Sequence, residues 1–365
     1  MRVLVVNAGS SSLRLSVVVD GVRVQQRELE RWDGEGESEA VQELLDEAGP
    51  VDAVGHRVVH GGSRRTGPAL VDAPLLDELT ALTDLAPLHQ PRALAGIAAL
   101  RDLLPRVPAV ACFDTAFHAG LPAEAATYAL PAGWNARWRL RRYGFHGLSH
   151  AHATRRAAEL LDRPVVDLRL VTCHLGAGAS LCAVVGGRSV DTTMGFTPAE
   201  GLVMRTRSGS VDPGLLLWLL QSGGLGVDEL ADALAHRSGL AGLSGTSGDL
   251  RDVRAAAAGG SAEAQLAYDV FVHRLAREAG GMVVAAGGLD ALVLTGGIGE
   301  HAPDVRRDLA ARLSPFGVAV DPARNEGADG DLDISAEGAP VRTLVVAAQE
   351  DVQVASEVES LLEGH

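Results

Sequence analysis

The chain has 365 residues, of which 47% are apolar and only 4% aromatic, so it is long enough for two domains with cores of Ala, Val and Leu. Its formal net charge of −15 disfavours nucleic acid and anionic membrane surfaces as partners. All 32 basic residues are arginines, which excludes lysine-dependent chemistry such as that of Walker A ATPases, protein kinases and pyridoxal phosphate enzymes.

The distribution of cysteine and apolar residues favours a cytoplasmic protein. Cys112, Cys173 and Cys182 stand alone in apolar runs, without paired spacing, and are typical of reduced core residues. The first residues lack the basic and apolar pattern of an export signal. Residues 279–299 have the length of a membrane span, but their glycines and Asp290 predict a helix, a turn and a strand instead. We therefore expect no membrane association.

Two segments have the same pattern of an apolar run, a loop of small residues and a second apolar run. They are residues 3–21 (VLVVNAGSSSLRLSVVVDG) and 170–187 (LVTCHLGAGASLCAVVGG). Each loop is too short for a crossover helix, so each segment predicts a β-hairpin whose bare backbone N–H groups can approach phosphate oxygens. A single loop of this kind is weak evidence for phosphate binding, but the pair of loops indicates an internal duplication and a nucleotide site.

The remaining elements repeat in the same order. In the first half, strands are expected at 3–6, 13–19, 22–30, 52–59 and 108–112, with helical stretches at 38–48 and 75–104. In the second half, strands are expected at 168–173, 180–185, 188–192, 290–295 and 341–347, with helices at 213–236 and 261–286. Residues 31–39 and 325–333 predict surface loops. A last helix at 351–362 is expected to pack back on the first domain, and the whole predicts a duplicated α/β protein.

Polar residues follow two of the predicted strands of the first half. Arg57 lies in GHRVVHGG (55–62), where glycines permit close approach of a carboxylate or phosphate to its guanidinium. Asp114 comes directly after the apolar strand of CFDTAFH (112–118), at the position where open α/β sheets bind ligands. Taken singly, a surface ion pair and a helix cap are the more ordinary interpretations of these two residues.

Three further motifs carry candidate functional groups. His146 in YGFHGLSH (143–150) is either a core histidine or a donor to a ligand. Arg205 and Arg207, beside a Gly-Ser loop in MRTRSGSVDP (204–213), resemble the arginines that neutralise a transferring phosphoryl group. The segment LVLTGGIGEHA (292–302), with Asp321 some twenty residues on, has the outline of a dinucleotide fingerprint, although too little chain follows to complete that sheet.

Ten ordered motifs together closely resemble the acetate kinase family. They are NAGSSSLRL, GHRVVHGG, LAPLHQP, FDTAFH, YGFHGLSH, CHLGAG, GFTPAEG, RTRSGSVDP, GGIGE and AAQED, and they run nearly from end to end. The resemblance implies two duplicated actin-like ATPase (ribonuclease H-like) α/β domains with an interdomain cleft, at 1–119 plus 352–365 and at 120–351. It also implies a homodimer and reversible transfer of the ATP γ-phosphoryl group to a short carboxylate such as acetate.

The resemblance also implies roles for individual residues. Catalysis would involve Asp114, His146, Arg207 and Arg57. Asp114 would act as acid or base, or mainly orient the arginines, and His146 would donate to the equatorial oxygens of the moving phosphoryl group. The acyl substrate would contact Arg57, Val59, Leu88, Phe145 and Pro198. The metal, Mg²⁺ with Mn²⁺ as an alternative, would be organised by Asn7 and Glu350. The nucleotide, ATP or ADP, would contact Ser10, Ser12, Arg14, His174, Leu175, Gly176, Ala177, Gly178, Asp249, Leu250, Arg251, Gly297, Ile298, Gly299, Glu300 and His301.

The chain departs from the family pattern at four nucleotide-side positions. Arg14 replaces a usual Lys, Ala177 a usual Asn, Arg205 a usual Gly and His301 a usual Asn. The loss of the Asn side chain at Ala177 removes a polar contact, which puts nucleotide affinity and preference in doubt. Three functions stay open: an acetate kinase, a propionate-type kinase, and a catalytically weak nucleotide-binding protein on the same fold.

Overall fold

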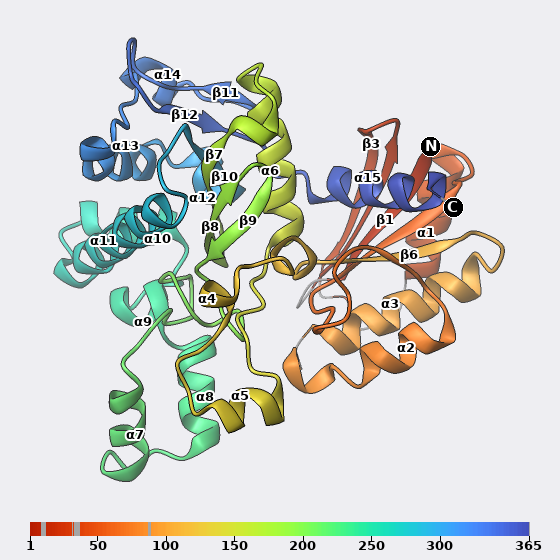
Figure 1. The fold of residues 1–365 in the computed structure, drawn as a ribbon, viewed down its shortest axis with the longest axis horizontal. Coiled ribbons are helices and arrows are strands. Elements are labelled where there is room, and N and C mark those ends of the chain that lie inside the picture. The colour runs from red at the N-terminus through yellow and green to blue at the C-terminus, as the bar shows by residue number, and fades with distance from the viewer. Residues whose placement is uncertain (9–11, 31, 33–36, 87–88, 365) are drawn as a thin grey trace. The chain divides into compact units, whose positions relative to one another are not determined.

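The computed structural model describes residues 1–8, 12–30, 32, 37–86 and 89–364, and the chain divides into two compact units. The first unit comprises residues 1–120, 145–152 and 349–365, and the second comprises 121–144 and 153–348. Each unit contains a six-stranded sheet with helices packed against it (Figure 1).

The sheet of the first unit has the strand order β3-β2-β1-β4-β6-β5. Its strands are β1 (Arg2–Ala8), β2 (Ser12–Val19), β3 (Val22–Glu30), β4 (Ala53–Val58), β5 (Ala69–Leu70) and β6 (Ala109–Phe113). The first three strands pair antiparallel, whereas β4 is parallel to β1 and β6 is parallel to β4. The carboxyl ends of β1, β4 and β6 therefore lie at one edge of the sheet.

Both faces of this sheet are covered, which explains why its strands are apolar at successive positions. Along β1, Leu4 and Val6 pack toward α1 (Glu37–Ala48) and α3 (Gln90–Leu103). Val3 and Val5 face the other way and pack against Val354 and Val358 of α15 (Glu350–Glu363), drawn in blue across the red strands in Figure 1. The prediction that the last helix packs on the first domain is confirmed.

The helical stretch predicted at 75–104 is interrupted. It forms α2 (Ala73–Thr80), a 3-10 turn (Thr83–Leu85) and α3, which has Pro91 in its first turn. A proline is tolerated there because the first helical N–H groups have no partner within the helix, whereas in a continuous helix it would break the hydrogen-bond ladder.

The sheet of the second unit repeats the plan of the first, with the order β11-β12-β10-β7-β8-β9. Its strands are β7 (Arg169–Leu175), β8 (Ala179–Val185), β9 (Arg188–Thr192), β10 (Ala291–Thr295), β11 (Leu332–Asp333) and β12 (Arg342–Val345). The hairpin β7–β8 is antiparallel, and β10 and β12 follow in parallel. Even the register shift between β2 and β3 recurs between β8 and β9, so the predicted duplication is confirmed.

The helices of the second unit differ more from the sequence predictions than its strands do. The predicted helix 213–236 is split at Gly224, whose φ of +77° suits glycine, into α7 (Pro213–Gln221) and α8 (Val227–His236). The long helix α11 (Ala262–Ala285) was predicted, but α10 (Leu250–Ala258), α13 (Pro303–Leu313) and α6 (Gly147–Leu160), which begins in the first unit, were not. The shorter helices are α4 (Ala123–Ala126), α5 (Ala132–Trp138), α9 (Gly239–Ser244), α12 (Gly296–His301) and α14 (Pro322–Glu326).

Two other sequence interpretations are corrected or settled by the fold. The dinucleotide interpretation of 292–302 is wrong, because β7, β8 and β9 pair antiparallel and Asp321 caps α14 by accepting a hydrogen bond from the Arg324 N–H. The predicted loop 325–333 also overlaps the end of α14 and contains β11. Residues 279–299 form the end of α11, a turn, β10 and part of α12, and none of the helices described is both long and apolar enough to cross a membrane.

Candidate functional site

The first unit holds an arginine clamp at the carboxyl ends of its parallel strands. Arg57, near the end of β4, donates from Nε and Nη2 to the two carboxylate oxygens of Asp114, at 3.2 and 2.6 Å. Asp114 directly follows β6 and is 1% exposed. Nη1 of Arg57 donates to Oδ1 of Asn7 at 3.0 Å, and Oε2 of Glu350 lies 3.6 Å from Nε. Three residues proposed from distant motifs, Asn7, Asp114 and Glu350, thus meet at the guanidinium of Arg57.

The electrostatics of this clamp fix the charge of Arg57. Burial by itself would lower the pKa of the guanidinium, but Asp114 and then Glu350 outweigh it, so the pKa of Arg57 is raised. Both Asp114 oxygens accept from Arg57, and the backbone N–H of Asp114 donates to the Val58 carbonyl. Asp114 therefore fixes the orientation of the Arg57 guanidinium through both of its carboxylate oxygens.

His146 lies next to this clamp along the backbone and has an unusual conformation. Its φ is +56°, a left-handed value that is uncommon for residues other than glycine and that concentrates at functional sites. The next residue, Gly147, donates its N–H to the Asp114 carbonyl at 2.8 Å, and a Cβ at this position would lie 2.2 Å from that oxygen. The His146–Gly147 segment is therefore fixed to the backbone of Asp114.

A buried histidine supports the adjacent Phe145. The His118 Nε2 is 3.0 Å from the Phe145 carbonyl oxygen, and burial lowers the pKa of His118 to about 4. The imidazole is therefore neutral near pH 7 and donates from Nε2. Phe145, 2% exposed, also meets the ring of His60 edge to face, with centroids 5.6 Å apart.

The residues expected to contact the acyl group are divided between the two units, and one of them is not described by the structure. Val59, which is 6% exposed, and Phe145 belong to the first unit. Pro198 belongs to the second unit, where its carbonyl accepts a hydrogen bond from Arg207. Leu88 lies outside the described residues.

On the first hairpin, the structure describes two of the three expected phosphate-side residues. Ser12 begins β2, whereas Ser10 lies outside the described residues. Arg14 pairs across the ladder with Glu28, at 3.2 Å between Nη2 and Oε2, and both side chains are exposed. Exposed pairs of this kind contribute little stability, so Arg14 can exchange Glu28 for a phosphate at small cost.

The second unit contains a cavity of about 350 Å³ built from three of the predicted nucleotide segments. Eight expected residues line it: Gly176, Ala177, Asp249, Leu250, Arg251, Gly297, Ile298 and His301. Asp249 caps α10 and is bound by the guanidinium of Arg251, which holds the pKa of Asp249 down at about 2. Such a cavity, with apolar walls and a few polar groups, matches a small-molecule site.

Five of the expected nucleotide residues in the second unit do not line this cavity, and four of them have other contacts that explain it. Leu175 is fully buried in β7, and Gly299 packs against Leu294. Gly178 closes a turn by accepting from the Gly176 N–H. The carboxylate of Glu300 accepts from the backbone N–H of Ala348, so it organises the loop behind the cavity. His174, a partly buried residue of β7, also does not line the cavity.

The sequence did not predict several of the residues that line this cavity. They are Met204, Leu240, Gly248, Phe271 and Ala302, and no local pattern marks them. Arg205, which also lines it, was singled out in the sequence as a possible phosphoryl-neutralising arginine and as a departure from the family pattern, but not as a nucleotide contact. Its backbone N–H donates to the Ala177 carbonyl at 3.1 Å, and its Nε donates to the Ser247 carbonyl at 3.3 Å. The two departures at 177 and 205 are therefore in direct contact.

Arg207 differs from Arg57 in having no acidic partner among the residues that the structure describes. Its Nη1 donates to the Pro198 carbonyl at 3.1 Å, and no carboxylate in the described part of the chain forms an ion pair with it. Burial accordingly lowers the pKa of Arg207. A partly buried guanidinium that no described carboxylate neutralises is a strong attractor for an anion.

A second buried arginine, missed from the sequence, supports the glycine turn of α12. Arg306 of α13 is 1% exposed. Its Nη1 donates to the carbonyls of Gly299 and Glu300, at 3.0 and 2.6 Å, and its Nε donates to Oδ1 of Asn325 at 2.8 Å. Arg306 therefore fixes the backbone next to the cavity-lining residues Gly297, Ile298 and His301. The sequence around Arg306 does not distinguish this buried arginine from neighbouring surface arginines such as Arg307, and this is why it was not predicted.

Comparisons with known proteins agree on one family. Residues 37–356 match the model of the Acetokinase family. The chain is 52% identical over 333 residues to an acetate kinase of Synechococcus sp. (strain JA-2-3B'a(2-13)), which covers 91% of this chain and 81% of the relative.

Solved structures give the same result. The crystal structure of Porphyromonas gingivalis acetate kinase has a TM-score of 0.91 and 34% identity, covering 99% of both chains. A propionate kinase from Francisella tularensis subsp. tularensis SCHU S4 has a TM-score of 0.90 and 34% identity, covering 98% of both. These matches confirm the duplicated α/β, actin-like ATPase fold class predicted from the sequence. The chain belongs to the acetokinase family.

Proposed function

We propose that this chain is an acetate kinase, which transfers the γ-phosphoryl group of ATP reversibly to acetate and gives acetyl phosphate and ADP. The observation that carries the proposal is Arg207, a partly buried guanidinium for which the described residues provide no acidic partner. In phosphoryl transfer the charge on the transferring group is spread over its equatorial oxygens, and a preorganised guanidinium stabilises it.

The chemistry requires alignment more than proton transfer. A carboxylate oxygen of acetate forms a bond to the γ-phosphorus while the bond to the β–γ bridging oxygen breaks, and ADP leaves with that electron pair. Acetate is already ionised near pH 7, so no base is needed to activate it. In this scheme Arg57 binds the carboxylate, Asp114 orients Arg57, and His146 donates to the phosphoryl oxygens.

The same scheme assigns the nucleotide and the metal. ATP would occupy the cavity of the second unit, between the 176–178 turn, the start of α10 and α12. Asn7 and Glu350 both offer oxygens beside Arg57, which suits Mg²⁺, an ion that takes few protein ligands and completes its shell with phosphates and water. Mg²⁺ would neutralise phosphate charge, and Mn²⁺ would fit the same oxygen donors.

The chain length of the preferred acid is the main alternative within this proposal. Val59 and Phe145 are apolar and buried, so they are suited to the methyl group of acetate or the ethyl group of propionate. One methylene in an apolar pocket changes binding by only about 1–3 kcal/mol. A series of acids is therefore needed to rank acetate against propionate.

We also propose a cytoplasmic homodimer. All three cysteines are buried thiols without disulfides, which agrees with a reducing compartment. Helix α7 has no buried residue, and it exposes Leu215, Leu217 and Trp218 at 46%, 55% and 57%. Large exposed apolar side chains on one helix are typical of a protein interface. A second copy of this chain would cover α7.

The first test of the function is hydroxamate formation from ATP, Mg²⁺, hydroxylamine and a series of C2 to C4 acids. We expect product with acetate or propionate. Arg207→Ala should lower kcat by about two to three orders of magnitude, because it removes a donor aimed at transition-state charge. Arg207→Lys should recover little, since one ammonium does not reproduce the guanidinium fork.

The matched control is Arg188→Ala, which removes an exposed arginine from β9 of the same unit and should keep parent activity. Absence of hydroxamate above the enzyme-free background with every acid would refute the kinase assignment. Near-parental activity of Arg207→Lys would refute only the bidentate role of that arginine.

The contact between Ala177 and Arg205 predicts a specific epistasis in the use of ATP. Ala177→Asn alone should change the KM for ATP less than tenfold, because Arg205 already serves this corner of the cavity. Arg205→Gly should weaken kcat/KM for ATP, by up to about ten- to a hundredfold for a lost bond to a charged oxygen, and adding Ala177→Asn should restore part of it.

The measurement is a double-mutant cycle on kcat/KM for ATP. Arg205→Ala serves as the control, because it removes the side chain without the added backbone freedom of glycine. Strict additivity of the two changes would mean that the departures at 177 and 205 are independent, despite the hydrogen bond between their backbones.

For the dimer, Trp218→Asp should shift the sedimenting species from two chains to one, because it places a charge in the proposed apolar interface. Trp134→Asp is the control, since Trp134 is 51% exposed on α5 of the same unit. A parent protein that sediments as a monomer, or a Trp218→Asp variant that stays dimeric, would exclude α7 as the interface.

A further inference from the structure

A second cavity of the second unit, about 330 Å³ in volume, is lined in part by the segment that carries Arg207. Its charged and hydroxyl-bearing residues are Ser208 and Ser210 of that segment, Arg237 and Ser238 between α8 and α9, and Arg274 of α11, and the rest of its lining is glycine and apolar residues. None of these residues lines the proposed nucleotide cavity. No motif in the sequence predicted it.

The lining is cationic in a chain that is otherwise strongly acidic. It contains two arginines and no carboxylate, although the chain has 47 Asp and Glu residues against 32 basic ones. Arg237 is partly neutralised, because its Nε donates to Asp232 at 2.7 Å. Arg274 is partly buried, and within the described residues it has no ion pair or side-chain hydrogen bond. A half-buried guanidinium without a partner favours an anion.

Hydroxyl groups complete the donor set. Ser210 Oγ accepts from the Gly201 N–H at 3.0 Å, and no acceptor for its own proton is found among the described residues. Ser208 and Ser238 donate to the backbone carbonyls of Gly209 and Ala233, and both also line the cavity. Guanidinium N–H groups and the exposed Ser210 hydroxyl are the donors that an oxyanion requires, and no carboxylate lines the cavity.

The cavity shares its wall with the catalytic segment. Gly239, at φ +63°, approaches so closely that a Cβ there would lie 2.2 Å from the Met204 carbonyl and 2.7 Å from the Arg207 carbonyl. The Ser238 N–H donates to the Thr206 carbonyl, and the Ser210 N–H donates to the Gly201 carbonyl, which closes the loop around Arg207. An anion held between Ser210 and Arg274 would therefore tie this loop to α11.

We propose that this cavity is a binding site for a small oxyanion, a phosphate or carboxylate group, held by Arg274, Ser210 and Arg237. The site is separate from the two reactants, and its occupancy stabilises the loop that carries Arg207. Inorganic phosphate and small carboxylates both offer negatively charged oxygen acceptors, so their binding is measured in separate titrations. Chloride at equal ionic strength corrects for general screening.

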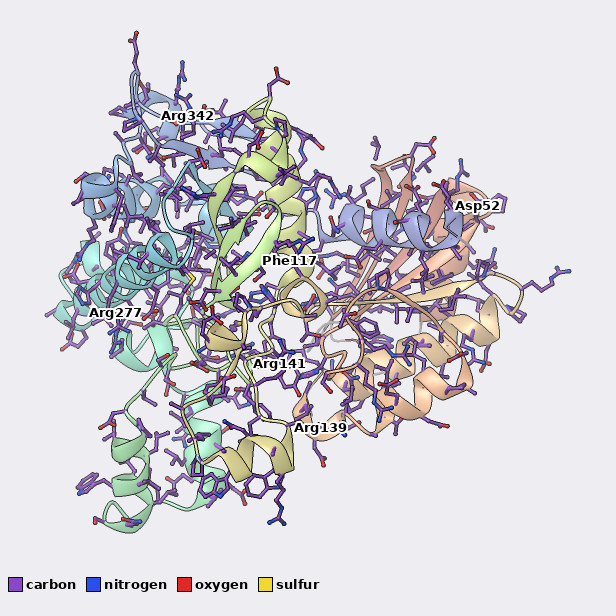
Figure 2. The ribbon with its side chains drawn as sticks, in the orientation of Figure 1. Asp52, Phe117, Arg139, Arg141, Arg277 and Arg342 are labelled. Carbon is purple, nitrogen blue, oxygen red and sulfur yellow. The ribbon has the colours of Figure 1, made fainter. Side chains whose placement is uncertain are left out.

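The experiment titrates inorganic phosphate and malonate into the full-length protein and follows melting temperature and binding heat. Arg274→Gln should weaken binding of at least one of these anions about tenfold or more. The matched control is Arg277→Gln, on the same helix and labelled in Figure 2, because Arg277 is 53% exposed and pairs with its neighbour Glu278. Both variants keep Arg57 and Arg207, so a difference between them reports on the cavity.

A second variant keeps the proposal testable if Arg274→Gln does not fold. Ser210→Asp places a carboxylate of the chain itself beside Arg274, so it should raise the melting temperature without ligand, by about 2 °C or more, and abolish the anion response. The proposal is overturned if Arg274→Gln binds both anions as tightly as the parent, if neither anion binds the parent more strongly than chloride, or if Ser210→Asp retains the parent response.

Discussion

The site of the first unit depends on the ion pair between Arg57 and Asp114. A guanidinium that is only 17% exposed is costly to desolvate unless it is fully paired, and Asp114 meets it with both oxygens. Because the pair is bidentate, it fixes the plane of the guanidinium as well as its charge. Asn7 and Glu350 then take defined positions around Arg57, and the Asp114 carbonyl holds Gly147 and hence the backbone of His146.

The sheet topology brings these residues together. β1, β4 and β6 run parallel, so Asn7, Arg57 and Asp114 all lie at or just beyond the same edge. The second unit repeats this arrangement with β7, β10 and β12, and there the turns after β7 and β10 line the nucleotide-type cavity. The two units thus share one plan but place different arginines on it: Arg57 of the first unit is paired with Asp114, whereas Arg207 of the second has no acidic partner among the described residues.

Much of this was predictable from the sequence, and the omissions have physical causes. The hairpins were recognisable because their loops interrupt two apolar runs, and Arg57 and Asp114 because each lies at or just after the end of such a run. The bidentate pairing of residues 57 positions apart was not predictable, because local patterns do not report on distant contacts. Arg306 and Arg274 lie on helices among exposed arginines, so only tertiary structure distinguishes them. The strands β5 and β11 have two residues each, too few for any periodicity.

We propose that Asp114 acts by holding Arg57 and not by removing a proton. The direct measurement is the pH dependence of kcat and kcat/KM for acetate in the parent and in Asp114→Asn, with folding checked by thermal melting. The account predicts that Asp114→Asn lowers kcat/KM by about ten- to a thousandfold, raises the KM for acetate, and leaves any acidic limb of the profile at the same pH. An unchanged KM for acetate, together with loss of the acidic limb in the variant, would contradict the account and identify Asp114 as the catalytic base.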